Sequence, residues 1–235
     1  MNARRMIDDI AAELALNGLI LRGGFAFAAG EPVPDGAAGA RAVLLVGHGG
    51  PTIWLHFEAW RDARPGDIAD PLDTWSRETI GAVAARFGAR AVSPSDRPWL
   101  PFQQWAMRAE QLKASPLGIL MHPEYGLWHA YRGALLFFDE AAAEEIARRG
   151  ARVHAPLHLC DACDGKPCVN ACPVSAHAQG SFACQACLDH VRAPAGRICH
   201  ETGCHDRNAC PAGAAHRYSR AQQAFHMRAF AGAGS

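Results

Sequence analysis

The sequence predicts an α/β fold, in detail an α+β domain followed by a small cysteine-rich domain. Two observations support this prediction. Helical and strand-like hydrophobic spacings alternate through roughly the first 150 residues. All nine cysteines, in contrast, lie between Cys160 and Cys210. We therefore expect two domains, residues 1–152 and residues 153–235.

Hydrophobic periodicity and local stop signals place the individual elements. Helices are expected over residues 1–16, 52–60, 72–87, 102–113 and 139–149. Strands are expected over residues 19–27, 41–46, 89–92, 118–122 and 127–138. Asn17-Gly18 is a good end for the first helix, and Asp70-Pro71 a good start for the third. This alternation predicts a three-layer core with helices on both faces of a sheet.

The composition narrows the class of protein. The chain has 235 residues, 49% of them hydrophobic, and 23 basic side chains balance 23 acidic ones. A balanced charge gives no electrostatic basis for binding duplex nucleic acid or an acidic membrane surface. No apolar run reaches the ~18 residues of a membrane helix, and no apolar signal core follows the N-terminal arginines. We expect a cytoplasmic protein, where clustered thiols bind metals more often than they form disulfides.

The second domain is expected to depend on metal. From Leu157 onward the sequence is rich in loops and has too few large apolar residues for a core of its own. Its first cysteines read Cys160-x2-Cys163-x4-Cys168-x3-Cys172-Pro173. Bacterial ferredoxins use the run C-x2-C-x2-C-x3-C-P, in which three thiolates hold one cluster and the fourth holds the other. The longer middle gap lengthens a loop without removing a ligand.

A second run of cysteines completes the pattern and again ends in Cys-Pro. We expect two [4Fe-4S] clusters, the first held by Cys160, Cys163, Cys168 and Cys210. The second would be held by Cys172, Cys199 and Cys204, together with either Cys184 or Cys187. Eight ligands leave one spare thiol, which agrees with the odd number of cysteines.

Zinc is the alternative metal. Cys160-x2-Cys163-x20-Cys184-x2-Cys187 has a spacing close to that of a zinc ribbon. This interpretation leaves the other five cysteines, including both Cys-Pro pairs, without a function. A zinc-stabilised interaction protein is therefore the third hypothesis, behind the two iron–sulfur hypotheses that are stated below.

Residues 122–133 read His-Pro-Glu-Tyr-Gly-Leu-Trp-His-Ala-Tyr-Arg-Gly. This block resembles one in the CblC-type cobalamin-processing proteins, which carry His-Pro-x-aromatic-Gly-x-Trp-x-x-x-Arg-Gly. It is also similar to the Pro-x-x-Gly-x-Trp block that precedes two [4Fe-4S] clusters in epoxyqueuosine reductase. The segments 46–54 and 70–73 resemble CblC-type sequence as well, so the resemblance covers roughly residues 40–215.

The resemblance implies a nitroreductase-like or CblC-like fold in the first domain and a base-off cobalamin pocket. Carried over by motif, the residues that line or shape the pocket are His122, Pro123, Tyr125, Gly126, Trp128, Arg132 and Gly133. A corrin is a broad apolar disc with amide arms, so aromatic walls, backbone donors and a glycine at a close approach suit it.

Two hypotheses follow for an iron–sulfur protein. In the first, the clusters relay single electrons from a ferredoxin or flavodoxin to a base-off corrin, for cobalamin reduction, processing or cobalamin-dependent reduction. In the second, the chain is a dicluster ferredoxin-type carrier without corrin, and its α/β half is a docking module.

Overall fold

The computed structural model describes residues 3–178 and 180–232, which belong to two compact units. The first unit comprises Met1–Gln111 and Ala130–Ala155. The second comprises Leu112–His129 and Pro156–Ser235. The second unit therefore includes a segment from the middle of the expected first domain, so the division does not fall at a single point near residue 152.

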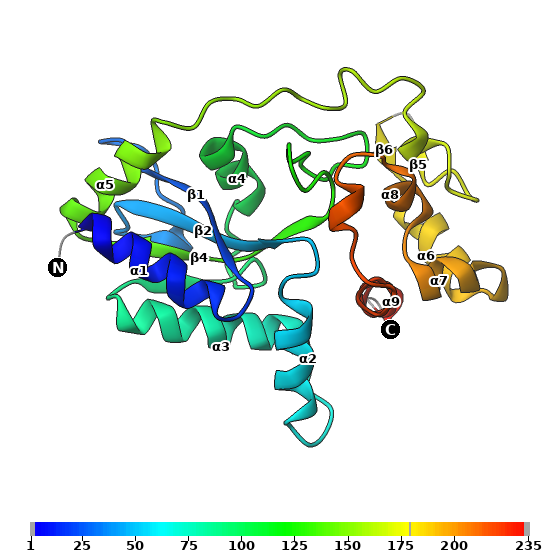
Figure 1. Ribbon diagram of the computed structural model, residues 1–235, viewed down its shortest axis with the longest axis horizontal. Coiled ribbons are helices and arrows are strands. Elements are labelled where there is room, and N and C mark those ends of the chain that lie inside the picture. Colours follow the sequence, from blue (N-terminus) through cyan, green and yellow to red (C-terminus); the bar gives the residue numbers. More distant parts are fainter. Residues whose placement is uncertain (1–2, 179, 233–235) are drawn as a thin grey trace. The chain divides into compact units, whose positions relative to one another are not determined.

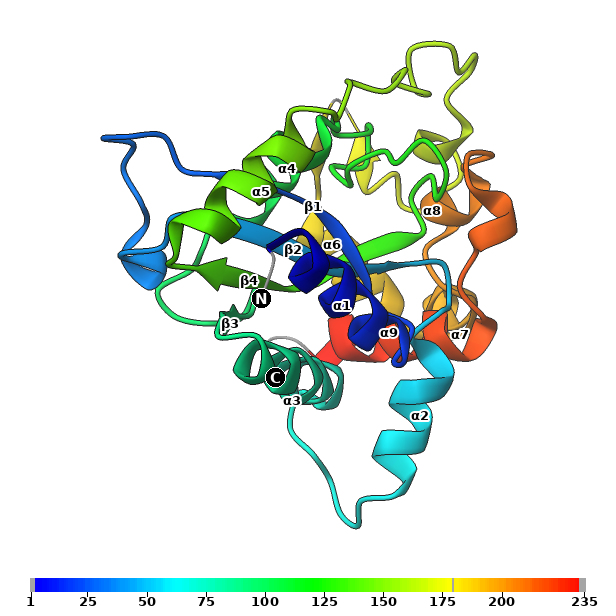
Figure 2. The ribbon, with the colours of Figure 1, turned by 60° about the vertical axis from the view of Figure 1, so that its left-hand side comes forward.

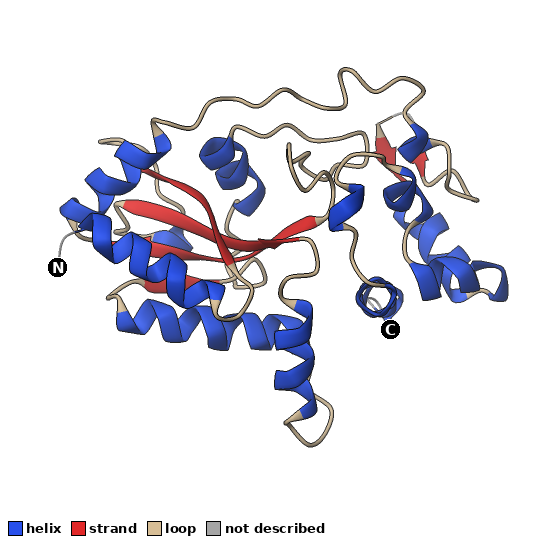
Figure 3. Ribbon diagram, viewed as in Figure 1, coloured by secondary structure: helices blue, strands red, loops and turns tan. Residues whose placement is uncertain are grey.

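A four-stranded sheet of order β1-β2-β4-β3 forms the centre of the first unit (Figures 1 and 3). Its strands are β1 (Ile20–Ala26), β2 (Ala42–Gly49), β3 (Arg90–Val92) and β4 (His129–Phe137). β1 pairs with β2, and β3 with β4, in antiparallel register. Every residue of β2 is buried. The near-continuous apolar sequence of β2 thus reflects a central strand that is covered on both faces.

Helices cover both faces of this sheet. The first unit contains α1 (Ala3–Ala15), α2 (Trp54–Asp62), α3 (Pro71–Arg86), α4 (Phe102–Glu110) and α5 (Glu140–Gly150). Successive residues of a strand point to opposite faces. Tyr131 of β4 bonds to Glu110 of α4, whereas the next residue, Arg132, pairs with Asp73 of α3. α3 and α4 therefore lie on opposite faces, with α1 packed beside α3 (Figures 1 and 2). The mixed α/β class is confirmed.

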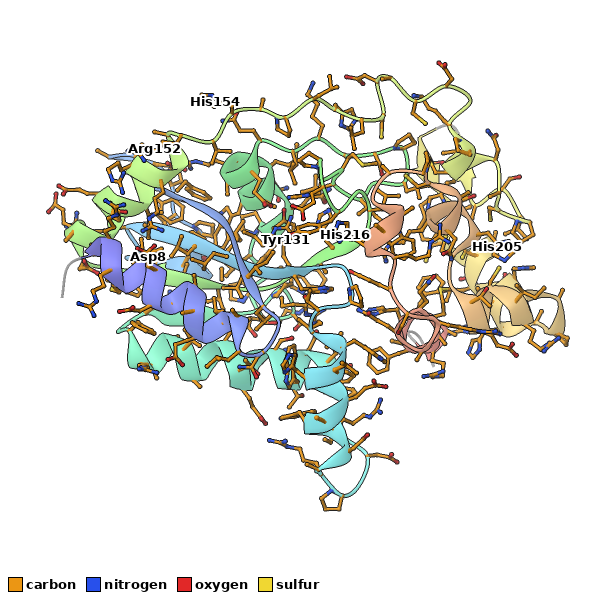
Figure 4. All side chains as sticks on the ribbon, in the orientation of Figure 1. Asp8, Tyr131, Arg152, His154, His205 and His216 are labelled. Atoms are coloured by element: carbon orange, nitrogen blue, oxygen red, sulfur yellow. The ribbon has the colours of Figure 1, made fainter. Side chains whose placement is uncertain are left out.

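A buried ion pair fixes α4 to the sheet. Arg22 of β1 is 1% exposed, and its guanidinium donates two hydrogen bonds to the Glu110 carboxylate, at 2.9 and 3.0 Å. It also donates to the carbonyl oxygen of His48 on β2. The Tyr131 hydroxyl, labelled in Figure 4, donates to the same carboxylate, and burial raises the pKa of this phenol well above its usual range. Satisfying a buried arginine in this way avoids the large cost of an unpaired charge.

One predicted strand is wrong. Residues 118–122 form no strand, and the segment before β4 makes only two isolated bridges, Ala114 with Leu120 and His122 with Gly126. Pro116 and Pro123 lie at either end of this stretch, and proline cannot donate to a sheet ladder. The apolar residues here are packed by turns against the cysteine-rich part of the chain.

The second unit is made of short elements. It contains the two-stranded sheet of β5 (His177–Ala178) and β6 (Ser181–Phe182), and helices α6 (Cys184–Arg192), α7 (Arg197–Thr202), α8 (His205–Ala209) and α9 (Arg220–Gly232). Helix α9 packs against α6 and α7. Within the described residues, no helix combines the length and apolarity needed to cross a membrane.

Helix α2 offers a matched test of the core of the first unit. Phe57 is fully buried, whereas Leu55, two residues earlier, is 76% exposed. We predict that Phe57→Ala lowers the free energy of unfolding by about 3–5 kcal/mol, because it leaves a cavity in the core. Leu55→Ala should change it by less than about 0.5 kcal/mol. Urea unfolding followed by circular dichroism measures both; equal effects would contradict this packing.

Candidate metal centre

Four thiols surround one cavity in the second unit. The cavity is lined by Cys160, Cys163, Cys168 and Cys210, with Pro116, Met121, Leu159, Lys166, Pro211 and Ala212 completing its wall. Apart from the thiols and Lys166, the lining side chains are apolar. Met121 and Leu127 also pack with Cys160, Cys168 and Cys210 in a buried cluster. The four cysteines that the ferredoxin-type spacing groups together therefore lie around a common space.

The thiols around this cavity are in an environment that disfavours a bare thiolate. Burial raises the pKa of Cys160, Cys168 and Cys210, and the charges of neighbouring cysteines in the same set raise it further. Lys166, whose ammonium donates to the Cys160 carbonyl oxygen at 2.7 Å, lowers the pKa of Cys160, but its single charge cannot balance four thiolates. Several thiolates can be charged together here only if a cation bound between them compensates the charge.

A second group of thiols interacts within α6, α7 and the neighbouring turns. Burial raises the pKa of Cys187 to about 11, and the charges of Cys204, Cys172, Cys199 and Cys184 contribute. Burial likewise raises the pKa of Cys199, with contributions from Cys204 and Cys172. The Ala176 backbone N–H donates to the Cys172 sulfur at 3.3 Å. Cys187 therefore lies in the environment of this group, whereas Cys184 is exposed.

The chain segments that carry the two groups are joined by Asp206, which the sequence analysis missed. Its side chain is fully buried. One carboxylate oxygen accepts from the Ala171 N–H at 3.1 Å, and the other lies 2.8 Å from Nδ1 of His177. Asp206 thereby ties α8 to the chain on both sides of Cys172. Its position between Cys204 and Cys210 is the one sequence signal that could have found it.

No set of three or more histidine, cysteine or carboxylate side chains within residues 3–178 and 180–232 is arranged to hold a single metal ion. The first group of thiols instead lines a cavity.

The His122 block forms a tight turn in the second unit. His122 and Gly126 exchange two backbone hydrogen bonds of 3.0 Å each. Nδ1 of His122 accepts from the backbone N–H groups of Glu124 and Tyr125, and its ring stacks on the Tyr125 ring at 4.4 Å. Pro123 is exposed at the tip of the turn. These contacts orient the imidazole and leave His122 a partly exposed member of the turn.

Gly126 is required by a close backbone approach. Its φ is +57°, and a Cβ at this position would lie 2.1 Å from the carbonyl oxygen of Ala212. Ala212 follows Cys210-Pro211, so the turn packs directly on the chain that carries one of the cavity thiols. A glycine permits both the left-handed conformation and this contact.

Trp128 is fully buried beside α8 and the chain that leads to α9. The guanidinium of Arg207 lies 4.6 Å from its ring, and the Tyr218 ring meets it edge-on at 5.3 Å. Arg207 also donates to the Leu127 carbonyl oxygen. The indole N–H has no hydrogen-bond partner among the described residues, and neither has the fully buried side-chain amide of Gln222 on α9.

The last two residues of the predicted corrin set belong to the first unit. Arg132 pairs with Asp73 and donates to the Ser76 hydroxyl at 3.1 Å. A Cβ at Gly133 would lie 2.8 Å from Ile80 of α3. Both residues therefore hold α3 on the sheet. The predicted corrin residues are thus divided between a turn that packs on the cysteine-rich chain and a strand that packs on α3.

A mixed α/β unit joined to a compact unit with nine cysteines is a recognisable class of structure. No protein-family model matches the sequence, and no curated protein sequence matches it. Solved structures do match. A selenomethionine-labelled epoxyqueuosine reductase superposes with a TM-score of 0.56 at 12% identity, over 94% of this chain and 69% of that one. The epoxyqueuosine reductase from Bacillus subtilis superposes with a TM-score of 0.53 at 14% identity, over 93% of this chain and 68% of that one.

A third match is an epoxyqueuosine reductase in complex with a modified tRNA stem loop, with a TM-score of 0.54 at 14% identity. It covers 93% of this chain and 68% of the other. At such low identity these matches establish the fold that the chain shares with epoxyqueuosine reductases.

Two glycines test the close approach at Gly126. Gly118 also has a positive φ, +75°, but no atom would lie within 4 Å of a Cβ at that position. Gly118→Ala should cost about 1–2 kcal/mol through backbone conformation alone. Gly126→Ala should cost at least about 3 kcal/mol, because the turn must also move away from Ala212. Thermal unfolding measures the difference; similar losses for both variants would show that the contact is unimportant.

Proposed function

We propose that this chain is an iron–sulfur electron-transfer protein with two [4Fe-4S] clusters. The observation that carries the proposal is the cavity lined by Cys160, Cys163, Cys168 and Cys210. These are the four cysteines that the ferredoxin-type spacing assigns to one cluster. The mostly apolar wall suits a site in which iron compensates the thiolate charges.

The second cluster would be held by Cys172, Cys187, Cys199 and Cys204. Support comes from the mutual electrostatic influence of these thiols and from the exposure of Cys184. The zinc alternative instead joins Cys160 and Cys163 to Cys184 and Cys187. The cavity favours clusters, because the thiols that share it with Cys160 and Cys163 are Cys168 and Cys210.

Serine variants of the two cysteines on α6 test this assignment. Cys187→Ser should lower the iron content from about eight to about four ions per chain, because one of two [4Fe-4S] sites loses a ligand. Cys184→Ser is the matched control, about one helical turn away, and should keep about eight. Iron analysis after anaerobic purification gives the result. Loss of iron from Cys184→Ser with full iron in Cys187→Ser would reverse the assignment.

A base-off cobalamin is the proposed electron acceptor, and the buried polar atoms of the second unit support a polar ligand. The Trp128 indole N–H and the Gln222 amide are buried without partners among the described residues. An unsatisfied buried polar group costs about 1–3 kcal/mol. The amide arms of a corrin carry the acceptors and donors that such groups need. Gly126, Arg132 and Gly133 give no such support, since packing accounts for them.

When bound, cobalamin would supply a cobalt centre that accepts single electrons at low potential. The protein's part would be to exclude water, hold the corrin amides and keep a cluster near the segment that carries Trp128. A ferredoxin or flavodoxin would provide the electrons. A dicluster carrier without corrin is the alternative, in which Trp128 and Gln222 simply pack.

Two adjacent glutamines on α9 separate these alternatives. Gln222→Met removes a fully buried amide without partners in the described structure, so it should raise the stability of the corrin-free protein by about 1 kcal/mol. It should also weaken binding of cob(II)alamin about tenfold. The amide of Gln223 bonds to the Tyr218 carbonyl oxygen and to Asn208, so Gln223→Met should be destabilising.

Urea unfolding and titration with cob(II)alamin, followed by electron paramagnetic resonance, measure these effects. A stabilised Gln222→Met variant in a protein to which no cobalamin form binds would favour the carrier without corrin.

A further inference from the structure

A small exposed patch on α7 lies one residue from a buried thiol of the second group. Ile198 is 57% exposed, whereas the next residue, Cys199, is buried. The side chains of Arg197 and of Arg220, which lies on α9, are 74% and 71% exposed, and both reach Glu201, at 3.3 and 3.5 Å. One carboxylate shared by two guanidiniums leaves a net positive charge. We call Ile198, Arg197, Arg220 and Glu201 the α7 patch.

The wider surroundings of the patch are also basic. Helices α6, α7 and α9 contain four arginines against two carboxylates. Arg192 on α6 and Arg228 on α9 are exposed, and both helices pack with each other and with α7. The balanced total charge of the chain thus conceals a basic region around the second group of thiols.

The chain around the first group of thiols has the opposite balance. Residues 156–171 contain Asp161 and Asp164 but only one basic residue, Lys166. An acidic protein approaching the second unit would therefore be attracted to the surface of α6, α7 and α9 and not to this segment.

We propose that the α7 patch is the docking surface for an acidic one-electron carrier protein of the ferredoxin or flavodoxin class, and that electrons enter at the second cluster. This inference rests on the proposed function. An exposed apolar side chain beside charges of one predominant sign is a typical arrangement for a transient interface, in which charge steers the encounter and the apolar contact excludes water. The backbone from Ile198 to Cys199 is then a short path from the surface to a cluster ligand.

The electron balance is simple for a reduced flavodoxin. Its flavin hydroquinone anion loses one electron and becomes the neutral semiquinone, while a [4Fe-4S]2+ cluster becomes [4Fe-4S]+. No bond is formed or broken in this step, and no proton needs to cross the interface.

Charge-neutralising variants test the docking surface. The double variant Arg197→Gln, Arg220→Gln should lower the second-order rate constant for cluster reduction by flavodoxin hydroquinone about tenfold at low salt. The difference should disappear at about 0.5 M salt, where charges are screened. Reduction by dithionite, a small molecule, should not change. Stopped-flow absorbance of the cluster-containing protein measures each rate.

The matched control is Arg5→Gln, Arg41→Gln, which removes two exposed arginines from the first unit. It should leave the flavodoxin rate within about twofold of wild type. Equal rates for wild type and the α7 double variant, with clusters intact, would overturn the docking surface alone. A protein that binds no iron would overturn the proposed function as well, so the two failures are distinguishable.

Discussion

Burial of several thiol groups in one small unit is the constraint on which the rest of this structure depends. Cys160, Cys168 and Cys210 are buried beside Met121 and Leu127, and burial raises their pKa values. Each thiolate formed there needs a nearby cation. The unit consists of short helices and long turns (Figure 3). Under the proposed function, a metal centre would stabilise such a unit more than hydrophobic area does.

The segment 112–129 belongs to this unit and contains most of the block, residues 122–133, that resembles cobalamin-processing proteins. Met121 and Leu127 contribute apolar walls next to the thiols, and Gly126 admits the backbone of Ala212. The block therefore has an architectural role whether or not a corrin binds. Its single unexplained feature is polar: the buried indole N–H of Trp128 has no acceptor in the described part of the chain.

The sequence predicted most of the fold because its elements carry local signals. The buried residues of α1 recur at helical spacing, and Gly88 and Gly150 lie at the ends of α3 and α5. Residues 118–122 were wrongly predicted because a short apolar run looks alike in a strand and in a buried turn. Arg22 and Glu110 are 88 positions apart in the sequence, and Asp206 and His177 are 29 positions apart. No local sequence pattern therefore reveals either contact.

The central claim is the presence of two [4Fe-4S] clusters. Iron and acid-labile sulfide analysis of anaerobically purified protein, combined with electron paramagnetic resonance after dithionite reduction, tests it most directly. The account predicts about eight iron and eight sulfide ions per chain and the signals of reduced [4Fe-4S]+ clusters, broadened if the two interact. A colourless protein that contains zinc and no sulfide would contradict it.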